Sequence, residues 1–383
     1  MFFNKSIEEI SIDDVRGLVR DKIPEGKTLD YKVHLQIETK DERKEILTDI
    51  CAFANASGGI IIYGIEEEAG TAKDLIGVKC DNQDVVKLKL DSLVRDGIEP
   101  RIWGVQVVSI PFDTEHYIFI IKVPSSWSRP HVVTLSNSWR FYSRNSAGKY
   151  QLDYFEIKNL FIASENTIDK INRFRLDRIS SIVAGNTPVP LGKNKNSYVI
   201  LHIIPIFNFD LNVKININQL DDDPKLLAPL RNRGYNHRIN YDGILTYTPD
   251  LSNISYTYLQ LYRNGIIEAV EQSTLDSNNA NFKEIPIIPL RREILALVNR
   301  TRTLYKQYQI SLPFMVMLSL IGVKDYFLKV DFMYHGFNMM SIDRDHLVIP
   351  EVIVDDFDSN LEVILKPIFD MIWNAAGASE AFE

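Results

Sequence analysis

The sequence has few cysteines, no long apolar runs and no excess of basic residues. Its two cysteines, Cys51 and Cys80, cannot build a disulfide framework or a four-cysteine zinc site. No apolar run reaches the roughly 18 residues that a membrane-spanning helix needs. Residues 1–6 lack the apolar core of a secretory signal. We therefore expect a soluble, cytoplasmic protein that has no membrane partner.

The charge balance excludes a broadly basic surface for nucleic acid. Lys and Arg total 43 against 51 Asp and Glu, a formal net charge of −8, which leaves room only for a local basic groove. The 383 residues are 45% hydrophobic, and this length predicts two domains. We place the N-terminal domain at residues 1–160, a helix and linker at 161–196, and the C-terminal domain at 197–383. Both domains mix helix and strand patterns, so the predicted fold class is α+β.

Apolar periodicity predicts the main elements of both domains. It indicates amphipathic helices at 6–20, 41–55 and 83–96, the second of them capped by Asp41. The uninterrupted apolar run at 60–65 predicts a buried central strand, and further strands are expected at 28–35, 105–110 and 117–123. In the C-terminal domain we expect a strand at 198–206, a hairpin turn at Asn264-Gly265, and helices at 290–309 and 358–375.

An acid–lysine pair stands out in the strand predicted at 28–35. Side chains at i and i+2 of a strand share a face, so Asp30 and Lys32 should project together, with Tyr31 turned away. Glu25 precedes them, and Glu66, Glu67 and Glu68 follow the central strand. Carboxylates beside a lysine can hold a divalent metal next to a phosphodiester. The alternative is that these charges form a solvated strand pair and a polar turn.

A second pattern interleaves basic and aromatic residues between 127 and 149. The basic residues are Arg129, Arg140, Arg144 and Lys149, and the aromatic residues are Trp127, Trp139, Phe141 and Tyr142. Such a mixture suits a groove that binds phosphates and stacks unpaired bases. Core aromatics with solvated arginines at strand edges would give the same pattern.

Isolated histidines and arginines elsewhere favour structural roles. We expect His131 to serve the Arg129-Pro130 turn and His202 to be a satisfied core histidine. Arg173, Arg175 and Arg178 suggest a helix surface or an interface.

Several of these motifs together resemble the Schlafen AlbA-like domain. The resemblance covers about residues 20–160. Its motifs are Glu25-x-x-x-Leu29-Asp30-Tyr31-Lys32, Ala52-Phe53-Ala54-Asn55-x-x-Gly58-Gly59, Gly64-Ile65-Glu66, Arg129-Pro130-His131 and Phe141-Tyr142-x-Arg144. The chain departs from the family pattern at Asp30, where the family usually has Glu, and at Gly26, where Ser is common.

The resemblance implies a metal-dependent endoribonuclease. Carried over by motif, Glu25, Asp30 and Glu66 would hold Mg²⁺ or Mn²⁺, and Lys32 would assist catalysis. Which of Glu66, Glu67 and Glu68 is the third acid stays open. The implied substrate is tRNA, another RNA or single-stranded DNA, and the implied role is anti-phage defence.

Two alternatives remain beside the nuclease. One is a regulator that binds nucleic acid through Arg129, Arg140, Arg144 and Lys149 without cutting it. The other is a subunit of a defence complex or of a homo-oligomer. Family members are also often labelled ATP-binding, but the glycines at 58, 59 and 64 are not followed by the Gly-Lys-Ser/Thr of a phosphate loop. ATP binding would therefore rest on the label alone and stays open, and the role of residues 197–383 stays open between assembly and sensing.

Overall fold

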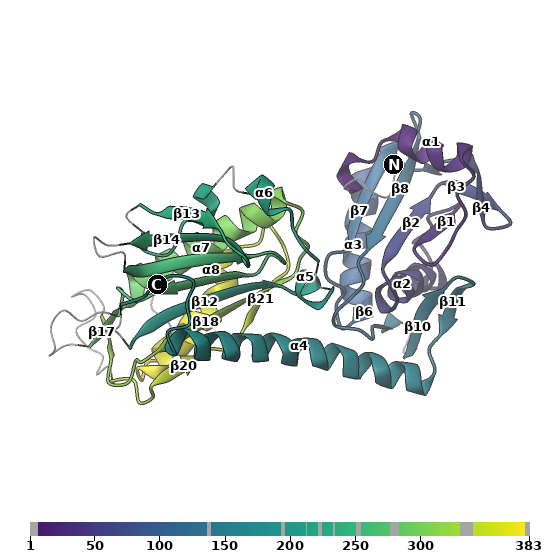
Figure 1. The fold of residues 1–383 in the computed structure, drawn as a ribbon. Coiled ribbons are helices and arrows are strands. Elements are labelled where there is room, and N and C mark those ends of the chain that lie inside the picture. Colours follow the sequence, from purple (N-terminus) through teal and green to yellow (C-terminus); the bar gives the residue numbers. More distant parts are fainter. Residues whose placement is uncertain are drawn as a thin grey trace. The chain divides into compact units, whose positions relative to one another are not determined.

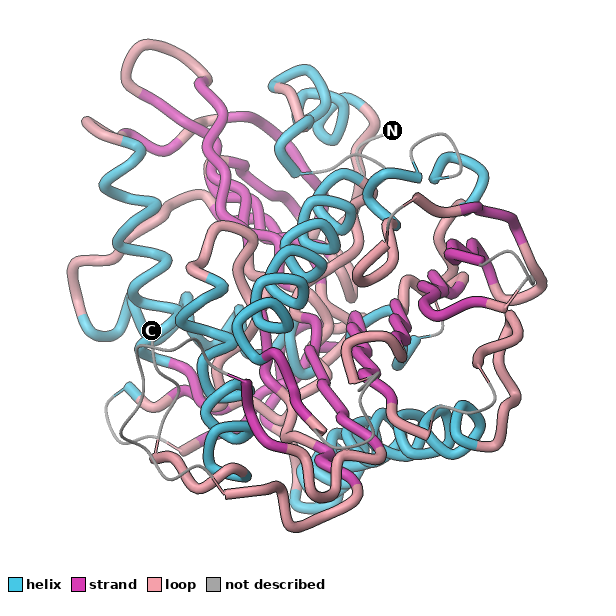
Figure 2. The backbone as a smooth tube through the Cα atoms, turned by 90° about the vertical axis from the view of Figure 1, so that its left-hand side faces the viewer, coloured by secondary structure: helices cyan, strands magenta, loops and turns pink. Residues whose placement is uncertain are grey.

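The chain divides into two compact units, which we call the N-terminal unit (Met1–Ile168) and the C-terminal unit (Asp169–Glu383). The computed structural model describes residues 7–135, 139–192, 196–211, 213–220, 224–232, 234–249, 254–275, 283–329 and 340–379. Figure 1 labels the elements and Figure 2 shows their mixture along the backbone. Both units combine helices with strands, so the fold is α+β. None of the described helices has the length and apolarity needed to cross a membrane.

The N-terminal unit contains a mixed sheet in the order β1-β2-β8-β5, with β7 also paired to β8. Strand β1 runs parallel to β2 and lies at the edge of the sheet, whereas β8 is antiparallel to its neighbours. The elements are η2 (Ile7–Glu9), α1 (Ile12–Arg20), β1 (Leu29–Lys32), α2 (Lys40–Asn55), β2 (Gly59–Tyr63), β3 (Ile65–Glu68), β4 (Thr71–Leu75), β5 (Val78–Lys79), α3 (Gln83–Gly97), β6 (Ile98–Glu99), β7 (Gln106–Pro111), β8 (His116–Val123), β9 (Val132–Val133), β10 (Arg140–Asn145), β11 (Gly148–Gln151) and the start of α4 (Tyr154–Val183).

Strand β2 separates two apolar cores. Ile61 and Tyr63 pack with α2 and α3, whereas Ile62 packs with α1 on the opposite face. Burial on both faces explains why this strand is an unbroken apolar run in the sequence. In the parallel register, Asp30 pairs with Ile61 and Lys32 with Tyr63. Asp30 and Lys32 therefore face α2, which places the acid–lysine pair beneath a helix.

Helix α2 begins one residue earlier than the sequence suggested, and its cap is different. Thr39, rather than the predicted Asp41, is the N-cap: its side chain accepts from the backbone N–H of Glu42, and the Glu42 side chain accepts from the backbone N–H of Thr39. This reciprocal capping box satisfies two donors at the helix start. Asp41 lies within the first turn of α2, where its negative charge interacts favourably with the positive end of the helix dipole.

Helix α4 is one continuous helix of 30 residues that runs from the N-terminal unit into the C-terminal unit (Figure 1). The predicted domain end at residue 160 and the first part of the segment 161–196, predicted as a helix and linker, fall within it. No glycine or proline occurs between residues 154 and 183, so nothing in this stretch breaks the helix.

The C-terminal unit is an eight-stranded antiparallel sheet in the order β13-β14-β15-β16-β12-β18-β20, with β21 also paired to β18. One face packs on α7 and α8, and the other packs on Ile179 and Ile182 of α4. The elements are β12 (Tyr198–Pro205), α5 (Ile206–Leu211), α6 (Ile217–Leu220), η4 (Pro224–Leu227), β13 (Asn236–Ile239), β14 (Gly243–Pro249), β15 (Ser255–Tyr262), β16 (Ile267–Glu271), β17 (Glu284–Pro286), α7 (Ile287–Gln307), β18 (Phe314–Ile321), β19 (Phe327–Lys329), β20 (His346–Val348), β21 (Val352–Val354) and α8 (Leu361–Ala375).

Candidate active site

Asp30 and Lys32 project together from β1, as their spacing predicts. The Lys32 ammonium lies 3.1 Å from Asp30 Oδ2, while Tyr31 packs in the opposite core. The Lys32 side chain is 36% exposed, but that of Asp30 is only 6% exposed. Burial disfavours the charged lysine, yet the carboxylates of Asp49 and Asp30 raise the pKa of Lys32. The lysine therefore stays cationic at the border between solvent and the buried acid.

Arg144 is the second cation on Asp30. Its Nη2 donates to Asp30 Oδ1 over 2.7 Å, and both side chains are 6% exposed. The guanidinium also donates to the backbone oxygens of Gly26 and Leu29 and lies 4.7 Å from the ring centre of Phe53. The sequence suggested Arg144 as a nucleic-acid ligand at a surface. Here it is buried, and its donors join β10 to the edge strand β1.

Asp49 of α2 belongs to the same cluster and was not singled out from the sequence. Its carboxylate lies 2.7 Å from Lys149 Nζ and 3.8 Å from Lys32 Nζ. Burial raises the pKa of Asp49, against the opposing effect of these two lysines. A signal available in the sequence was its position three residues after Ile46 and four before Phe53, on the predicted inner face of the helix. A carboxylate there needs a cation opposite it.

Lys149, another predicted nucleic-acid ligand, is committed to this network. Besides Asp49 it pairs with Glu45 at 2.8 Å, and its side chain is 21% exposed. The two carboxylates raise the pKa of Lys149 although burial opposes the charge. Its charge is balanced within the unit, so it contributes little to a basic surface.

Glu25 caps the edge strand beside Asp30. Its Oε1 accepts from the backbone N–H of Tyr31 over 2.7 Å. Burial raises the pKa of Glu25, the Tyr31 hydrogen bond opposes this, and the Asp30 and Glu67 carboxylates raise it further. A cation placed near Glu25 would offset the burial and the neighbouring carboxylates that disfavour the ionisation of Glu25.

The third acid of the predicted set, Glu66, points elsewhere. It lies 3.8 Å from Lys73 Nζ on the β3–β4 hairpin. Glu67 is the neighbour of Glu25: its Oε2 accepts from the Gly70 N–H over 2.5 Å, and Gly70 O accepts from the Glu25 N–H over 2.7 Å. The structure thus brings Glu25, Asp30 and Lys32 together and leaves Glu66 with Lys73.

The donor set fits a two-carboxylate metal site rather than a three-carboxylate one. Among the described residues, no group of three or more His, Cys, Asp or Glu is arranged to hold a metal ion. Magnesium commonly uses one or two protein carboxylates and completes its shell with substrate phosphate and water. Asp30 Oδ2 is buried and lies 3.1 Å from Lys32 Nζ, so a cation bound by Glu25 and Asp30 would share this oxygen with the lysine.

The remaining motif residues hold the unit together. The Asn55 side chain accepts from the His131 N–H over 2.7 Å and donates to the oxygens of His131 and Tyr142. His131 is fully buried, and its Nδ1–H donates to Pro100 O over 2.6 Å. This single amide links the Ala-Phe-Ala-Asn, Arg-Pro-His and Phe-Tyr motifs.

The glycine turn before β2 is a packing feature. Gly58 has a φ of +70°, and a Cβ there would lie 2.5 Å from the backbone nitrogen of Ser125. A Cβ at Gly59 would lie equally close to the Phe53 ring. Both positions require glycine for chain conformation and close approach, so the turn needs no bound phosphate to explain it.

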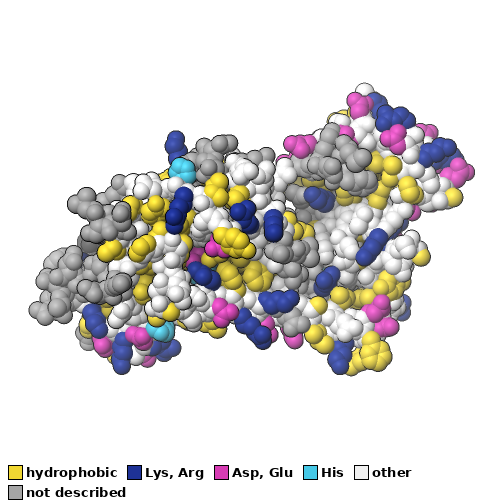
Figure 3. Space-filling model, in the orientation of Figure 1, with side chains coloured by type: hydrophobic (Ala, Val, Ile, Leu, Met, Phe, Trp, Pro, Cys, Tyr) yellow, Lys and Arg dark blue, Asp and Glu magenta, His cyan; other side chains and the backbone are white. Residues whose placement is uncertain are grey.

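Arg129 and Arg140 complete the predicted nucleic-acid-binding set. Arg129 donates to Ala56 O at the end of α2 over 3.1 Å. Arg140 is exposed next to Trp139, which is 64% exposed. On the face drawn in Figure 3, Lys and Arg side chains are scattered among acidic and apolar ones. Of the four predicted cations, Arg140 is the most accessible to a nucleic acid.

The C-terminal unit corrects the interpretation of two arginines. Arg175 is 3% exposed and donates to Leu318 O and Ile349 O over 2.5 and 2.8 Å. Arg178 pairs through two nitrogens with Glu268, which also lies 3.1 Å from His202 Nε2. Of the two predicted roles, a helix surface or an interface, the exposed surface was wrong for both, because they anchor α4 to the sheet. His202 is fully buried, which confirms its place in the core, but only its Nε2 has a hydrogen-bond partner, since the buried Nδ1 has none.

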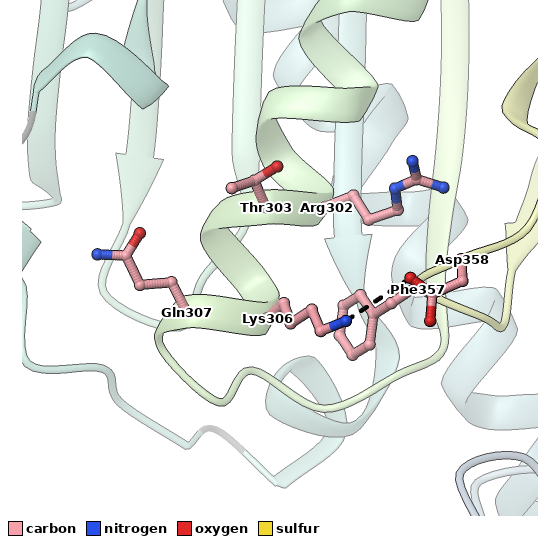
Figure 4. Close-up of a pocket in the computed structure, with 6 residues that line it drawn as sticks. All are labelled: Arg302, Thr303, Lys306, Gln307, Phe357 and Asp358. Atoms are coloured by element: carbon pink, nitrogen blue, oxygen red, sulfur yellow. Dashed lines mark ion pairs between the residues drawn. The ribbon is translucent and has the colours of Figure 1, made fainter.

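A shallow pocket of about 390 Å³ lies at the end of α7 (Figure 4). Its two cations are already engaged. Arg302 donates to Ser359 O and to Asn299, and Lys306 lies 3.6 Å from Asp358. The pocket lacks the adjacent carboxylates found around β1, so the cluster on β1 is the stronger candidate site.

Comparison with known proteins gives one family match. Residues 25–153 match a protein-family model described as "Schlafen, AlbA_2". The DIP2311 protein from Corynebacterium diphtheriae is 19% identical over 37% of this chain and 26% of that chain, with a TM-score of 0.26. The N-terminal domain of a RecG-related protein from Nitrosomonas europaea is 16% identical over 38% of this chain and 96% of that chain, with a TM-score of 0.28. No curated protein matches.

Proposed function

Because residues 25–153 form a Schlafen AlbA-like domain, we propose that this chain is a metal-dependent endoribonuclease. The observation that carries the proposal is the meeting of Glu25 with Asp30 and Lys32 of the edge strand, where two neighbouring carboxylates lie beside a partly exposed ammonium. The substrate class, tRNA or other RNA with single-stranded DNA as the alternative, follows from the family resemblance, as does a role in anti-phage defence.

Glu25 and Asp30 would hold Mg²⁺ or Mn²⁺, which supplies Lewis-acid activation of the phosphodiester and of water. Arg144 and Lys32 place two cations against the buried Asp30 carboxyl group. Lys32 also has an exposed face from which it can stabilise negative charge on a phosphoryl oxygen. Of the acids considered for the third position, Glu67 rather than Glu66 is tied to Glu25, since the Glu67 carboxylate and the Glu25 backbone N–H both bond to Gly70; it would support the two-carboxylate site and would not be a third metal ligand.

Nucleic acid would approach through the exposed residues around this cluster. Lys27 lies exposed between Glu25 and Asp30 in the chain, and Arg140 with Trp139 offers a cation beside an aromatic ring. An exposed aromatic ring can stack on an unpaired base, and a nearby cation can contact the backbone. This arrangement supports binding of unpaired rather than fully duplex segments.

A second candidate is binding without cleavage. The observation that favours it is the pairing of Asp30 with Arg144 at 2.7 Å, because a carboxylate neutralised by arginine attracts a divalent cation less strongly. On this account the acids are structural and the domain only binds nucleic acid.

Incubation of the purified chain with total tRNA and with single-stranded DNA separates the two candidates. Each substrate is tested with Mn²⁺, with Mg²⁺ and with EDTA, and binding is measured in EDTA. Discrete fragments that need the metal support the nuclease. Salt-sensitive binding with no fragments under any condition contradicts the nuclease and supports the binding domain.

A further inference from the structure

The first turns of α4 carry an exposed apolar stripe. Phe155 is 71% exposed, Tyr154 70%, Phe161 49% and Ile162 46%. Their spacing of i, i+1, i+7 and i+8 places them along one side of the helix. In Figure 3 apolar side chains gather at the end of the N-terminal unit where α4 begins. Four large apolar side chains exposed together are unusual on a soluble surface and indicate an interaction site.

Two opposite charges lie on the same side of the helix. Lys158 and Glu165 are both exposed and stand on either side of Phe161 and Ile162. Seven residues of helix separate them by about 10 Å, too far for a salt bridge within the helix. In an antiparallel pair of identical helices, however, each lysine would meet the glutamate of the other helix.

We propose that this stripe, which we define as Tyr154, Phe155, Lys158, Phe161, Ile162 and Glu165, pairs with the same stripe of a second copy of the chain. The two-fold axis would pass between Phe161 and Ile162. Lys158 then faces Glu165, and Phe161 faces Ile162, in both halves of an isologous interface. The same register brings Phe155 opposite the partly buried Ile168.

The charge of the segment favours a second copy over nucleic acid. Between residues 153 and 165, Lys158 is accompanied by Asp153, Glu156 and Glu165, so the segment is acidic. A phosphate backbone would be repelled by it. A second copy instead offers one glutamate for each lysine.

The interface should be of modest strength. Each aromatic side chain can bury about 150–250 Å² in full, and these side chains are already partly covered. The pair would therefore lie at the low end of the roughly 1,200–2,000 Å² of specific interfaces. We expect a dimer that forms and dissociates over the micromolar range of concentration.

Charge reversal in the full-length chain tests the register. Sedimentation velocity over a concentration series should show dimers for the wild type. Lys158→Glu alone and Glu165→Lys alone each place like charges opposite each other, and each should weaken dimerisation by at least about tenfold. The double variant should dimerise as the wild type does. An equimolar mixture of the two single variants should form a mixed dimer, because both of its facing pairs are then opposite in sign.

Phe155→Glu should abolish the dimer without changing the circular dichroism spectrum, since Phe155 is 71% exposed. A wild type that is monomeric throughout, or single reversals that the double reversal does not rescue, would overturn the proposal. A monomeric wild type that loses RNA affinity on Phe155→Ala would also overturn it and assign the stripe to nucleic acid.

Discussion

Arg144 Nη2 and Asp30 Oδ1 lie 2.7 Å apart, and each side chain is 6% exposed. This ion pair joins β10 to the edge strand β1, which are more than a hundred residues apart in the chain. It also fixes the acid on which the proposed chemistry depends. Removing one member of a buried pair leaves the other charge without its principal compensation.

Arg144→Ala should therefore destabilise the N-terminal unit by about 3–5 kcal/mol, because Asp30 loses its buried partner. Urea denaturation followed by tryptophan fluorescence measures this. Arg140→Ala on the same strand is the matched control, and as an exposed residue it should change stability by less than about 0.5 kcal/mol. Equal small effects for both variants would show that the pair contributes little.

The same contact shows what the sequence could and could not predict. The spacing of Asp30 and Lys32 on one strand correctly predicts their shared face, and the periodicity of 41–55 predicts α2. Nothing in the local pattern shows that Arg144 lies on Asp30, since the two meet only through the tertiary packing of β10 on α2 and β1. The alternation around Arg144 fits an exposed strand edge as well as a buried one.

Asp49, Glu66 and α4 illustrate other limits. Asp49 lies on the inner face of a helix, where only the position of β1 makes a carboxylate acceptable. Glu66 and Glu67 differ by one residue, and the register shift between them decides which one turns toward Glu25. The length of α4 agrees with the absence of helix breakers, but the buried contacts of Arg175 and Arg178 with the sheet cannot be read from the local pattern.

Lys32 should matter for cleavage more than for folding. Lys32→Met should reduce single-turnover cleavage of tRNA by about 10²-fold, because a positive group near the developing phosphoryl charge is lost. Lys73→Met is the matched control: Lys73 pairs with Glu66 on the β3–β4 hairpin and should leave cleavage within about twofold. Equal losses in the two variants would remove Lys32 from the proposed chemistry.

His131 should make the N-terminal unit less stable in mild acid. Burial lowers the pKa of His131 to about 4 from the usual 6.5, although its hydrogen bond to Pro100 opposes this. Below pH 6.5 the His131 imidazole binds a proton in the unfolded chain. In the folded chain the same imidazole stays neutral until about pH 4. Stability is thus fully present above pH 6.5, and about 3 kcal/mol is lost as the pH falls to 4.

Denaturation midpoints between pH 7 and pH 4 measure the His131 effect. His131→Asn keeps a donor for Pro100 O but does not titrate, so its stability should fall less steeply over this range. Parallel pH curves for the variant and the wild type would show that His131 does not contribute.

The central claim is that Glu25 belongs to a cleaving site. Glu25→Gln can still accept the Tyr31 N–H, so it removes the charge and preserves the cap of β1. Glu66→Gln removes an acid of the neighbouring hairpin. Single-turnover cleavage of tRNA in Mn²⁺ by these two variants beside the wild type is the most direct measurement. We predict a loss of at least about 10²-fold for Glu25→Gln and less than about twofold for Glu66→Gln. Wild-type cleavage by Glu25→Gln, or no metal-dependent cleavage by the wild type, would contradict the account.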